Sequence, residues 1–167
     1  MRRETFATSG TRAAVRFFQT YAAGDPCADA SFPKQLTEQG AVPMGGTFKP
    51  SGQAKPRFVV AAWKDRSDLA RVDVIKAWVD ANDQAQEQVF STAASSPSAV
   101  CMTWDDPSPP TGPALYYARV LEVPTPRWSV HDCAKAGVVN PQECKQGGRL
   151  NATVRERAWT SPIWFVP

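Results

Sequence analysis

Five short segments rich in β-branched and aromatic residues follow one another between residues 57 and 123. They span residues 57–65, 71–80, 85–93, 98–106 and 114–123, and no stretch with the length and periodicity of a helix separates them. This composition favours strands, and consecutive strands joined by turns pair antiparallel by default. The sequence therefore predicts a mainly all-β fold, an antiparallel two-sheet β-sandwich.

Long loops and one or two short helices complete this prediction, because the 167 residues include 15 Pro and 10 Gly. The Gly- and Pro-rich residues 22–56 predict a long connection with a short helix at Phe32–Gln39. Residues 127–137 are expected to begin extended and then to form a second short helix, with Asp132 near its start and Gly137 as its stop.

The sequence also predicts how individual strands are placed in the fold. The continuous apolar run 57–65 is typical of a strand buried on both faces. In residues 71–80 we expect Arg71, Asp73 and Lys76 to break toward solvent. Pro162 interrupts the last segment, 152–167, which predicts a strand at a sheet edge.

Charge and hydropathy exclude two classes of partner. The net charge is only +3, and no run of Lys and Arg exceeds two residues, so we expect no nucleic-acid partner. No window reaches the ~18 apolar residues of a membrane span, and no apolar stretch follows the basic start, so no signal peptide is visible.

The four cysteines allow three pairings. Cys133 and Cys144 flank a short polar segment, which predicts a small disulfide-closed loop, with Cys27–Cys101 as the companion bridge. The alternative is four reduced cysteines, with Cys101 simply buried in a strand.

No set of residues completes a catalytic or metal site. With His131 as the single histidine, a zinc site in this chain is improbable, and we expect no cofactor. The triplet His131-Asp132-Cys133 holds the residue types of a nucleophilic site, but neighbouring side chains diverge in direction. Two acidic groups could bind a cation, although a hairpin turn and a solvated strand exit are favoured for them: Asp80, Asn82, Asp83 and Glu87; Asp105 and Asp106.

Six tryptophans offer a sugar-stacking platform as the alternative to a purely structural role. Most of them suit the core of a small β-fold. Arg127, Trp128 and Trp159 suit it least, because each lies beside polar residues and a turn, so they are candidates for a pocket or an interface.

Several longer strings carry a resemblance to a known family. They are "RRETFATSGTR", "VPMGG", "RVDVIKAWVD", "ALYYARVLEVPTPRW" and "RERAWTSPIWFVP". In order and content they resemble the C-terminal part of the bacterial domain-of-unknown-function family 3604, from near residue 1 to the last residue. The segment from Phe90 to Ala99 is shorter than in the family, and the turn after "WVD" lacks the expected Gly.

The resemblance implies an upstream barrel of the polymerase-and-histidinol-phosphatase type, a hydrolase-like module that could hold a divalent metal in a full-length relative. Residues 1–13 would be the remnant of that barrel's end, and residues 14–167 a C-terminal β-sandwich domain. Thr8, Ser9, Gly10 and Arg12 would then stand at the mouth of the barrel, where they could line a pocket. Whether the chain is a fragment, a complete gene product or a freestanding relative stays open.

The first functional hypothesis is an accessory, structural domain of an exported hydrolase-like protein, periplasmic or secreted and not catalytic alone. Its partner would be the upstream barrel or a second copy of itself. The alternatives are a freestanding β-sandwich that binds a carbohydrate or envelope component, and a small hydrolase using His131 with Cys133 or a Glu.

Overall fold

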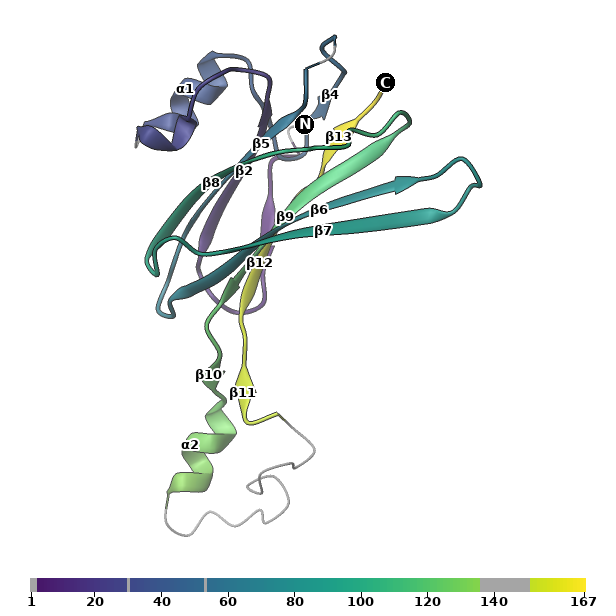
Figure 1. Ribbon diagram of the computed structural model, residues 1–167. Coiled ribbons are helices and arrows are strands. Elements are labelled where there is room, and N and C mark those ends of the chain that lie inside the picture. The colour runs from purple at the N-terminus through teal and green to yellow at the C-terminus, as the bar shows by residue number, and fades with distance from the viewer. Residues whose placement is uncertain (1–2, 30, 53, 136–150) are drawn as a thin grey trace.

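Two β-sheets packed face to face form the body of the molecule in the computed structural model, which describes residues 3–29, 31–52, 54–135 and 151–167 (Figure 1). The large sheet contains β1 (Phe6–Thr8), β4 (Thr47–Phe48), β6 (Leu69–Val79), β7 (Ala85–Ala93), β9 (Ala114–Glu122), β12 (Arg157–Thr160) and β13 (Ile163–Phe165). The small sheet runs in the order β3 (Val42–Pro43), β2 (Ala14–Thr20), β5 (Arg57–Trp63) and β8 (Ala99–Asp105). The predicted all-β sandwich is confirmed.

The long strands of the large sheet pair antiparallel around β9. On one side β9 pairs with β6, which continues through the Asp80–Asp83 turn into β7. On the other side β9 pairs with both β12 and β13, and β13 adds the short β4 in parallel. The turn that leads into β4 needs glycine, since Gly45 has a φ of 83° and a Cβ there would lie 2.2 Å from the Arg3 carbonyl oxygen.

The core lies between the two sheets. Aromatic rings fill its centre, where Phe58 of β5 stacks on Tyr116 of β9 with 4.2 Å between ring centroids. The apolar run of β5 is buried on both faces, as the sequence predicts, because its other face is also covered. A further ring contact, Phe90 with Trp104 at 4.1 Å, joins the edge strands β7 and β8 of the two sheets.

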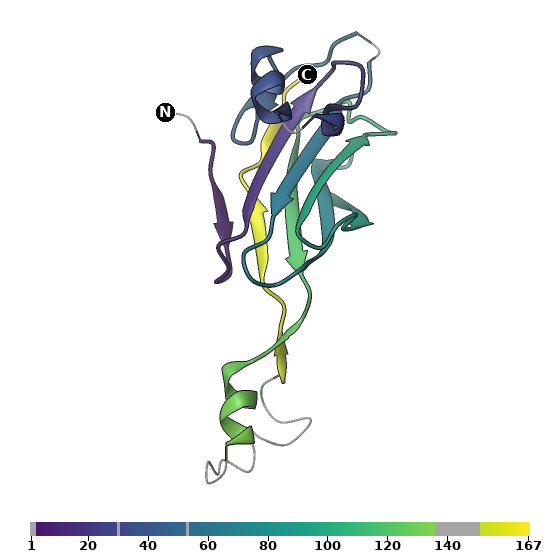
Figure 2. The same ribbon diagram turned by 90° about the vertical axis from the view of Figure 1, so that its left-hand side faces the viewer.

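The outer face of the small sheet is covered by a helix and a disulfide. The predicted helix is present as α1 (Phe32–Glu38), and Phe32 and Leu36 pack on Val59 and Ala61 of β5. The 3₁₀ turn η1 (Pro26–Ala28) precedes it and holds Cys27, which is bonded to Cys101 of β8. This layer covers the centre of the small sheet's outer face, whereas no described helix lies over the outer face of the large sheet (Figure 1, Figure 2).

An arm extends from one end of the sandwich (Figure 1, Figure 2). It is built from the short pair β10 (Thr125–Pro126) and β11 (Thr153–Val154) and the helix α2 (Trp128–Ala134). β10 follows directly after β9, and β11 leads into β12, so the arm prolongs two neighbouring strands of the large sheet.

Three sequence expectations about β6 and the last strand are wrong. Asp73 and Lys76 do not face solvent: their side chains are 0% and 3% exposed, because each is enclosed by partners of opposite charge. The last segment is not an edge strand, since β12 lies between β1 and β9, and β13 lies between β9 and β4. Pro162 falls in the gap between β12 and β13, where its missing N–H breaks no ladder bond.

The helix of the arm also differs from the expectation. It begins at Trp128, so Asp132 lies in its second half and not near its start. The predicted stop, Gly137, lies outside the described residues.

Candidate functional site

The four N-terminal candidates lie at the edge of the large sheet, beside β12. The hydroxyl of Ser9 donates to the carboxylate of Glu156 and accepts the N–H of Arg157 at 3.0 Å. Thr8 donates its hydroxyl to the carbonyl oxygen of Thr11 at 2.6 Å, at the bend that leads into β2. These polar groups satisfy one another, and they fix the path of the chain between β1 and β2.

Gly10 and Arg12 complete this bend. Gly10 has a φ of 146° and lies against the Glu156 carboxylate. Arg12 forms an exposed ion pair with Asp65 at 3.4 Å, and its backbone N–H together with its side chain lowers the pKa of Asp65. Nothing in this arrangement leaves a described group aimed at a ligand, so the placement of these residues at a barrel mouth stays a prediction.

A buried charge network ties the loop after β8 to the large sheet. Asp106 is fully buried, and both of its carboxylate oxygens lie close to the Lys76 ammonium, at 3.0 and 3.2 Å. Tyr116 donates its hydroxyl to the same carboxylate at 2.8 Å, and burial followed by this contact raises the pKa of Tyr116. Asp106 is thus not a solvated strand exit. Because its acceptors are filled by protein donors, the network is structural.

A second carboxylate is enclosed on the outer face of the large sheet. Asp73 accepts hydrogen bonds from Ser91 at 2.7 Å and Arg119 at 2.8 Å, and it pairs with Arg71 at 2.8 Å. Burial by itself raises the pKa of Asp73, but the bonds from Ser91, Arg119 and Arg71 outweigh it and hold the pKa below its ordinary value.

Trp159 lies next to this network. On the neighbouring strand it is paired with Arg119, and the guanidinium of Arg157 lies 5.8 Å from its ring centroid. Arg155, Arg157 and Trp159 occupy alternate positions, which in an extended chain project to the same face. This alternation was readable in the string "RERAW", and it is the signal that could have identified Arg155 and Arg157.

Arg127 and Trp128, the other two aromatic-group candidates, lie on the arm and not beside Trp159. Arg127 precedes α2 and donates its backbone N–H to the Ala152 carbonyl oxygen at 3.0 Å. Trp128, at the start of α2, is 71% exposed, which is the largest exposure among the described large apolar side chains. Its role is therefore not to fill the core.

A pocket of about 470 Å³ lies at the base of the arm, and we call it the arginine pocket. Arg127, Arg155 and Arg157 line it, together with Pro124 and residues 151–154. Among the described residues none of the three guanidinium groups has an acidic partner within ion-pair distance, and the Nε of Arg127 is buried without an acceptor.

A second hollow of about 380 Å³, which we call the apolar groove, lies at the opposite end of the large sheet. Its exposed members are Val79, Trp164 and Val166, with 55%, 39% and 42% of their surface accessible. The groove is lined by Ala77, Trp78, Val79, Ala85, Gln86, Pro113, Ala114, Leu115, Trp164, Phe165 and Val166. Trp164 is one of the six tryptophans of the sequence, and its exposure could not be predicted because it depends on which face of β13 the side chain occupies.

The remaining catalytic and metal candidates do not converge. Cys133 is disulfide-bonded, so it is not the thiolate of a His131–Cys133 pair; its predicted partner Cys144 lies outside the described residues. The Asp80 carboxylate accepts the N–H groups of Asn82 and Gln84, which lowers its pKa and builds a hairpin turn. Within residues 3–29, 31–52, 54–135 and 151–167, no three His, Cys, Asp or Glu side chains are grouped to hold a metal ion.

Membrane insertion by a helix has no support in the described part of the chain. Neither α1 nor α2 is long and apolar enough to cross a bilayer.

Comparison with known proteins identifies a family. A family model described as a protein of unknown function (DUF3604) matches residues 1–101 and 96–167, so that together the two matches span the chain. No curated protein and no solved structure matches.

Proposed function

The chain belongs to the DUF3604 family of proteins of unknown function, and we propose that it is an accessory β-sandwich domain of a hydrolase-like protein. In this proposal the domain docks onto a barrel domain through the apolar groove and has no catalysis of its own. The division of the chain into a barrel remnant, residues 1–13, and a sandwich, residues 14–167, is part of the same proposal.

The exposed apolar groove is the observation on which the proposal rests. Apolar side chains that are exposed together in a hollow form the kind of surface at which another protein binds. The small sheet has its own cover, α1, whereas the groove has none among the described residues. A docked domain would bury this exposed apolar surface, which is formed by Val79, Trp164 and Val166.

The start of the chain is placed well for such a partner. The Thr5 carbonyl oxygen accepts the N–H of Ser161 at 2.8 Å, three residues before Trp164. β1 begins next to the end of β12, at the end of the sandwich away from the arm (Figure 2). A domain that precedes Thr5 would emerge within a few residues of the groove, so that a short connection suffices.

The proposal also places the protein in the periplasm or outside the cell. The disulfide between Cys27 and Cys101 supports this, because such bonds form and persist in oxidising compartments.

The first test is the coding sequence immediately upstream of Met1, which should encode a metal-binding barrel. Hydrogen exchange then compares the sandwich alone with the sandwich joined to that barrel. Amides around Leu115 and Trp164 should exchange more slowly in the joined protein, whereas those of residues 89–93, the part of β7 that does not line the groove, should not change.

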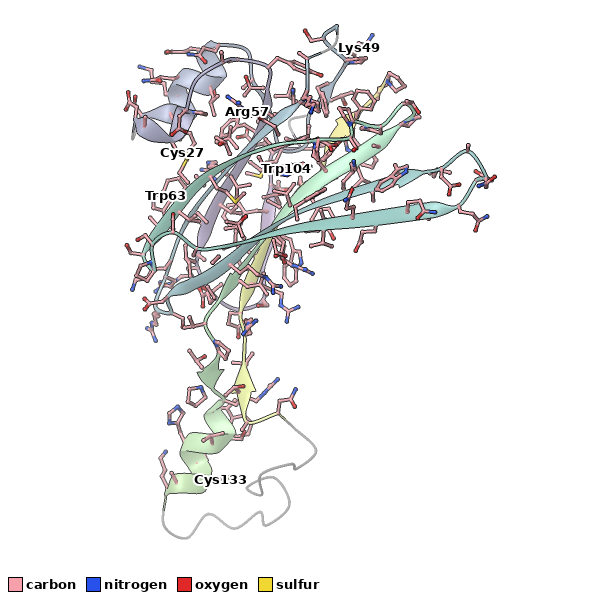
Figure 3. All side chains as sticks on the ribbon, in the orientation of Figure 1. Cys27, Lys49, Arg57, Trp63, Trp104 and Cys133 are labelled. Carbon is pink, nitrogen blue, oxygen red and sulfur yellow. A yellow bond between two sulfur atoms is a disulfide. The ribbon has the colours of Figure 1, made fainter. Side chains whose placement is uncertain are left out.

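A pair of variants sharpens the comparison. Trp164→Arg should remove the added protection, while Trp63→Arg should retain it, because Trp63 is equally exposed, at 40% against 39%, but lies on the small sheet (Figure 3). The proposal fails if the groove exchanges equally fast with and without the barrel. It also fails if the isolated chain binds a metal and hydrolyses a phosphoester.

A further inference from the structure

We propose that the arginine pocket is a binding site for an oxyanion, the phosphate, sulfate or carboxylate group of an acidic saccharide or of a free ion. This inference is independent of the docking proposal, because the arginine pocket and the apolar groove lie at opposite ends of the large sheet.

The first argument is the contrast with four other arginines of the chain. Arg12, Arg57, Arg71 and Arg119 each pair with an aspartate, at distances of 2.6 to 3.4 Å. The three arginines of the pocket have no such partner among the described residues, although they converge on one hollow. Three fixed positive charges repel one another, and a bound anion converts this repulsion into attraction.

The second argument is the chemistry of the side chains. Guanidinium groups stay charged at every physiological pH, and their planar fork matches the two oxygens of a carboxylate, phosphate or sulfate group. No described Asp or Glu lines the pocket to compete for these donors. The arrangement therefore selects an anion and rejects a metal cation.

The third argument is the construction of the site. Arg155 and Arg157 come from the chain that leads from β11 into β12, and Arg127 comes from the opposite side of the arm, where it is bonded to Ala152. The pocket exists because the β10–β11 pair holds these two segments together. Within the part of the chain that the structure describes, the Nε of Arg127 is buried without an acceptor, an uncommon state for a charged group that has no ligand.

Two tryptophans each neighbour an arginine of the pocket, and they point to a sugar as the carrier of the anion. Trp159 lies against Arg157, and Trp128 follows Arg127 in the chain and is largely exposed. Indole faces offer the flat, weakly polar surface on which a pyranose ring stacks, while the arginines would hold its charged substituent.

The test is a titration of the full chain, in which binding is monitored by tryptophan fluorescence and by calorimetry. The probes are inorganic phosphate, inorganic sulfate, oligogalacturonate as a carboxylated saccharide, and a neutral maltooligosaccharide. We expect saturable binding of at least one anionic probe with one site per chain, and none of the neutral one. Tighter binding of oligogalacturonate than of the two ions identifies the saccharide; the reverse order identifies a free ion.

Two double variants, each of which loses two positive charges, distinguish binding at a specific site from general electrostatic attraction. Arg127→Gln with Arg155→Gln should weaken anion binding by at least about tenfold, the loss expected for a charge-assisted hydrogen-bond pair. Lys34→Gln with Lys49→Gln, on α1 and directly after β4 at the end of the sandwich away from the arm (Figure 1, Figure 3), should change it less than about twofold because long-range attraction is largely screened by salt.

Circular dichroism of both double variants verifies that they fold. Equal weakening in the two, or no saturable binding of any anionic probe by the unmodified chain, overturns the proposal.

Discussion

At the scale of single residues, Asp73 links stability to pH. Its folded pKa lies below the unfolded value of about 3.9. A carboxylate whose pKa is lowered by folding contributes its full stabilisation when the pH is above its pKa in the unfolded chain. This contribution is lost as the pH falls through its pKa in the folded protein. We therefore expect acid destabilisation to begin below about pH 4.

The variant Asp73→Asn tests this link. At pH 7 it should lower the free energy of unfolding by about 2 kcal/mol, the order of a charge-assisted hydrogen bond. Urea denaturation at pH 7 and pH 3 should show a smaller pH dependence than in the unmodified chain. Asp83→Asn, on the exposed β6–β7 turn, is the matched control and should leave the stability at pH 7 unchanged, since Asn tolerates the positive φ of 61° there. A pH dependence identical in all three proteins would contradict the assignment.

Asp106 should matter more than its place in a loop suggests. Asp106→Ala leaves the Lys76 ammonium buried without a counter-charge, so we expect a loss of about 3–5 kcal/mol. Tyr116→Phe removes one neutral donor from the same carboxylate and should cost about 1 kcal/mol. Chemical denaturation measures both. Equal effects of the two variants would mean that the Lys76–Asp106 pair contributes little.

These charged residues also show where sequence reasoning stops. Lys and Asp on a strand are assigned to solvent because unpaired charges are seldom buried. Their partners are distant in the chain: Asp106 is 30 residues from Lys76, and Arg119 is 46 residues from Asp73. Only the fold brings these pairs together, so alternation alone predicted solvent exposure for two side chains that are buried.

At the scale of elements, the Cys27–Cys101 disulfide attaches the layer formed by η1 and α1 to the small sheet. It joins η1 to β8 across 74 positions of sequence. Closing a loop of this length restricts the unfolded chain by about 4 kcal/mol in the chain-entropy model. The double variant Cys27→Ala with Cys101→Ala should therefore melt well below the unmodified protein, as calorimetry would record. A melting temperature unchanged by the two substitutions would show that α1 holds the cover by packing alone.

The arm should be separable from the sandwich. Its two strands meet at its base, where Pro126 lies opposite Thr153. Replacing residues 127–152 with an Asn-Gly turn, which suits a two-residue hairpin, should change the stability of the sandwich by less than about 1 kcal/mol. It should also abolish oxyanion binding, since Arg127 is removed. A loss of cooperative unfolding, seen by denaturation, would mean that the arm is part of the core.

Long, patterned elements were predictable, and short ones were not. The segments from 57 to 123 were identified because periodicity and turn residues extend over enough positions. The helix α1 was expected only as a short helix within the long connection of residues 22–56, which has little periodicity. The two-residue strands β3 and β4 have no pattern of their own. They exist only because neighbouring strands offer free backbone groups.

At the scale of the whole molecule, the isolated chain should self-associate. The apolar groove is exposed in a single copy, and two copies can cover it by packing against each other. Sedimentation velocity should show a mass that rises with concentration. Trp164→Arg should restore a monomer, whereas Trp63→Arg should not. A mass that stays that of one chain at every concentration would argue against a groove that attracts a partner.

The architecture as a class could be inferred, but the surfaces that matter could not. Antiparallel pairing and two sheets follow from strands joined by turns. Which outer face stays open depends on where α1 packs, and the end of the sheet that bears the groove depends on the register of β6, β9 and β13. Neither is encoded in a local pattern.

The continuity of the arm with β9 and β12 has a mechanical consequence. Hydrogen bonds between antiparallel strands run perpendicular to the strands. Tension applied along the arm therefore loads the hydrogen bonds between β9 and β6 in shear, all of them at once. A ligand held at the base of the arm would thus pull the middle of the sheet along its strands, the direction in which the hydrogen bonds resist together and do not break one after another.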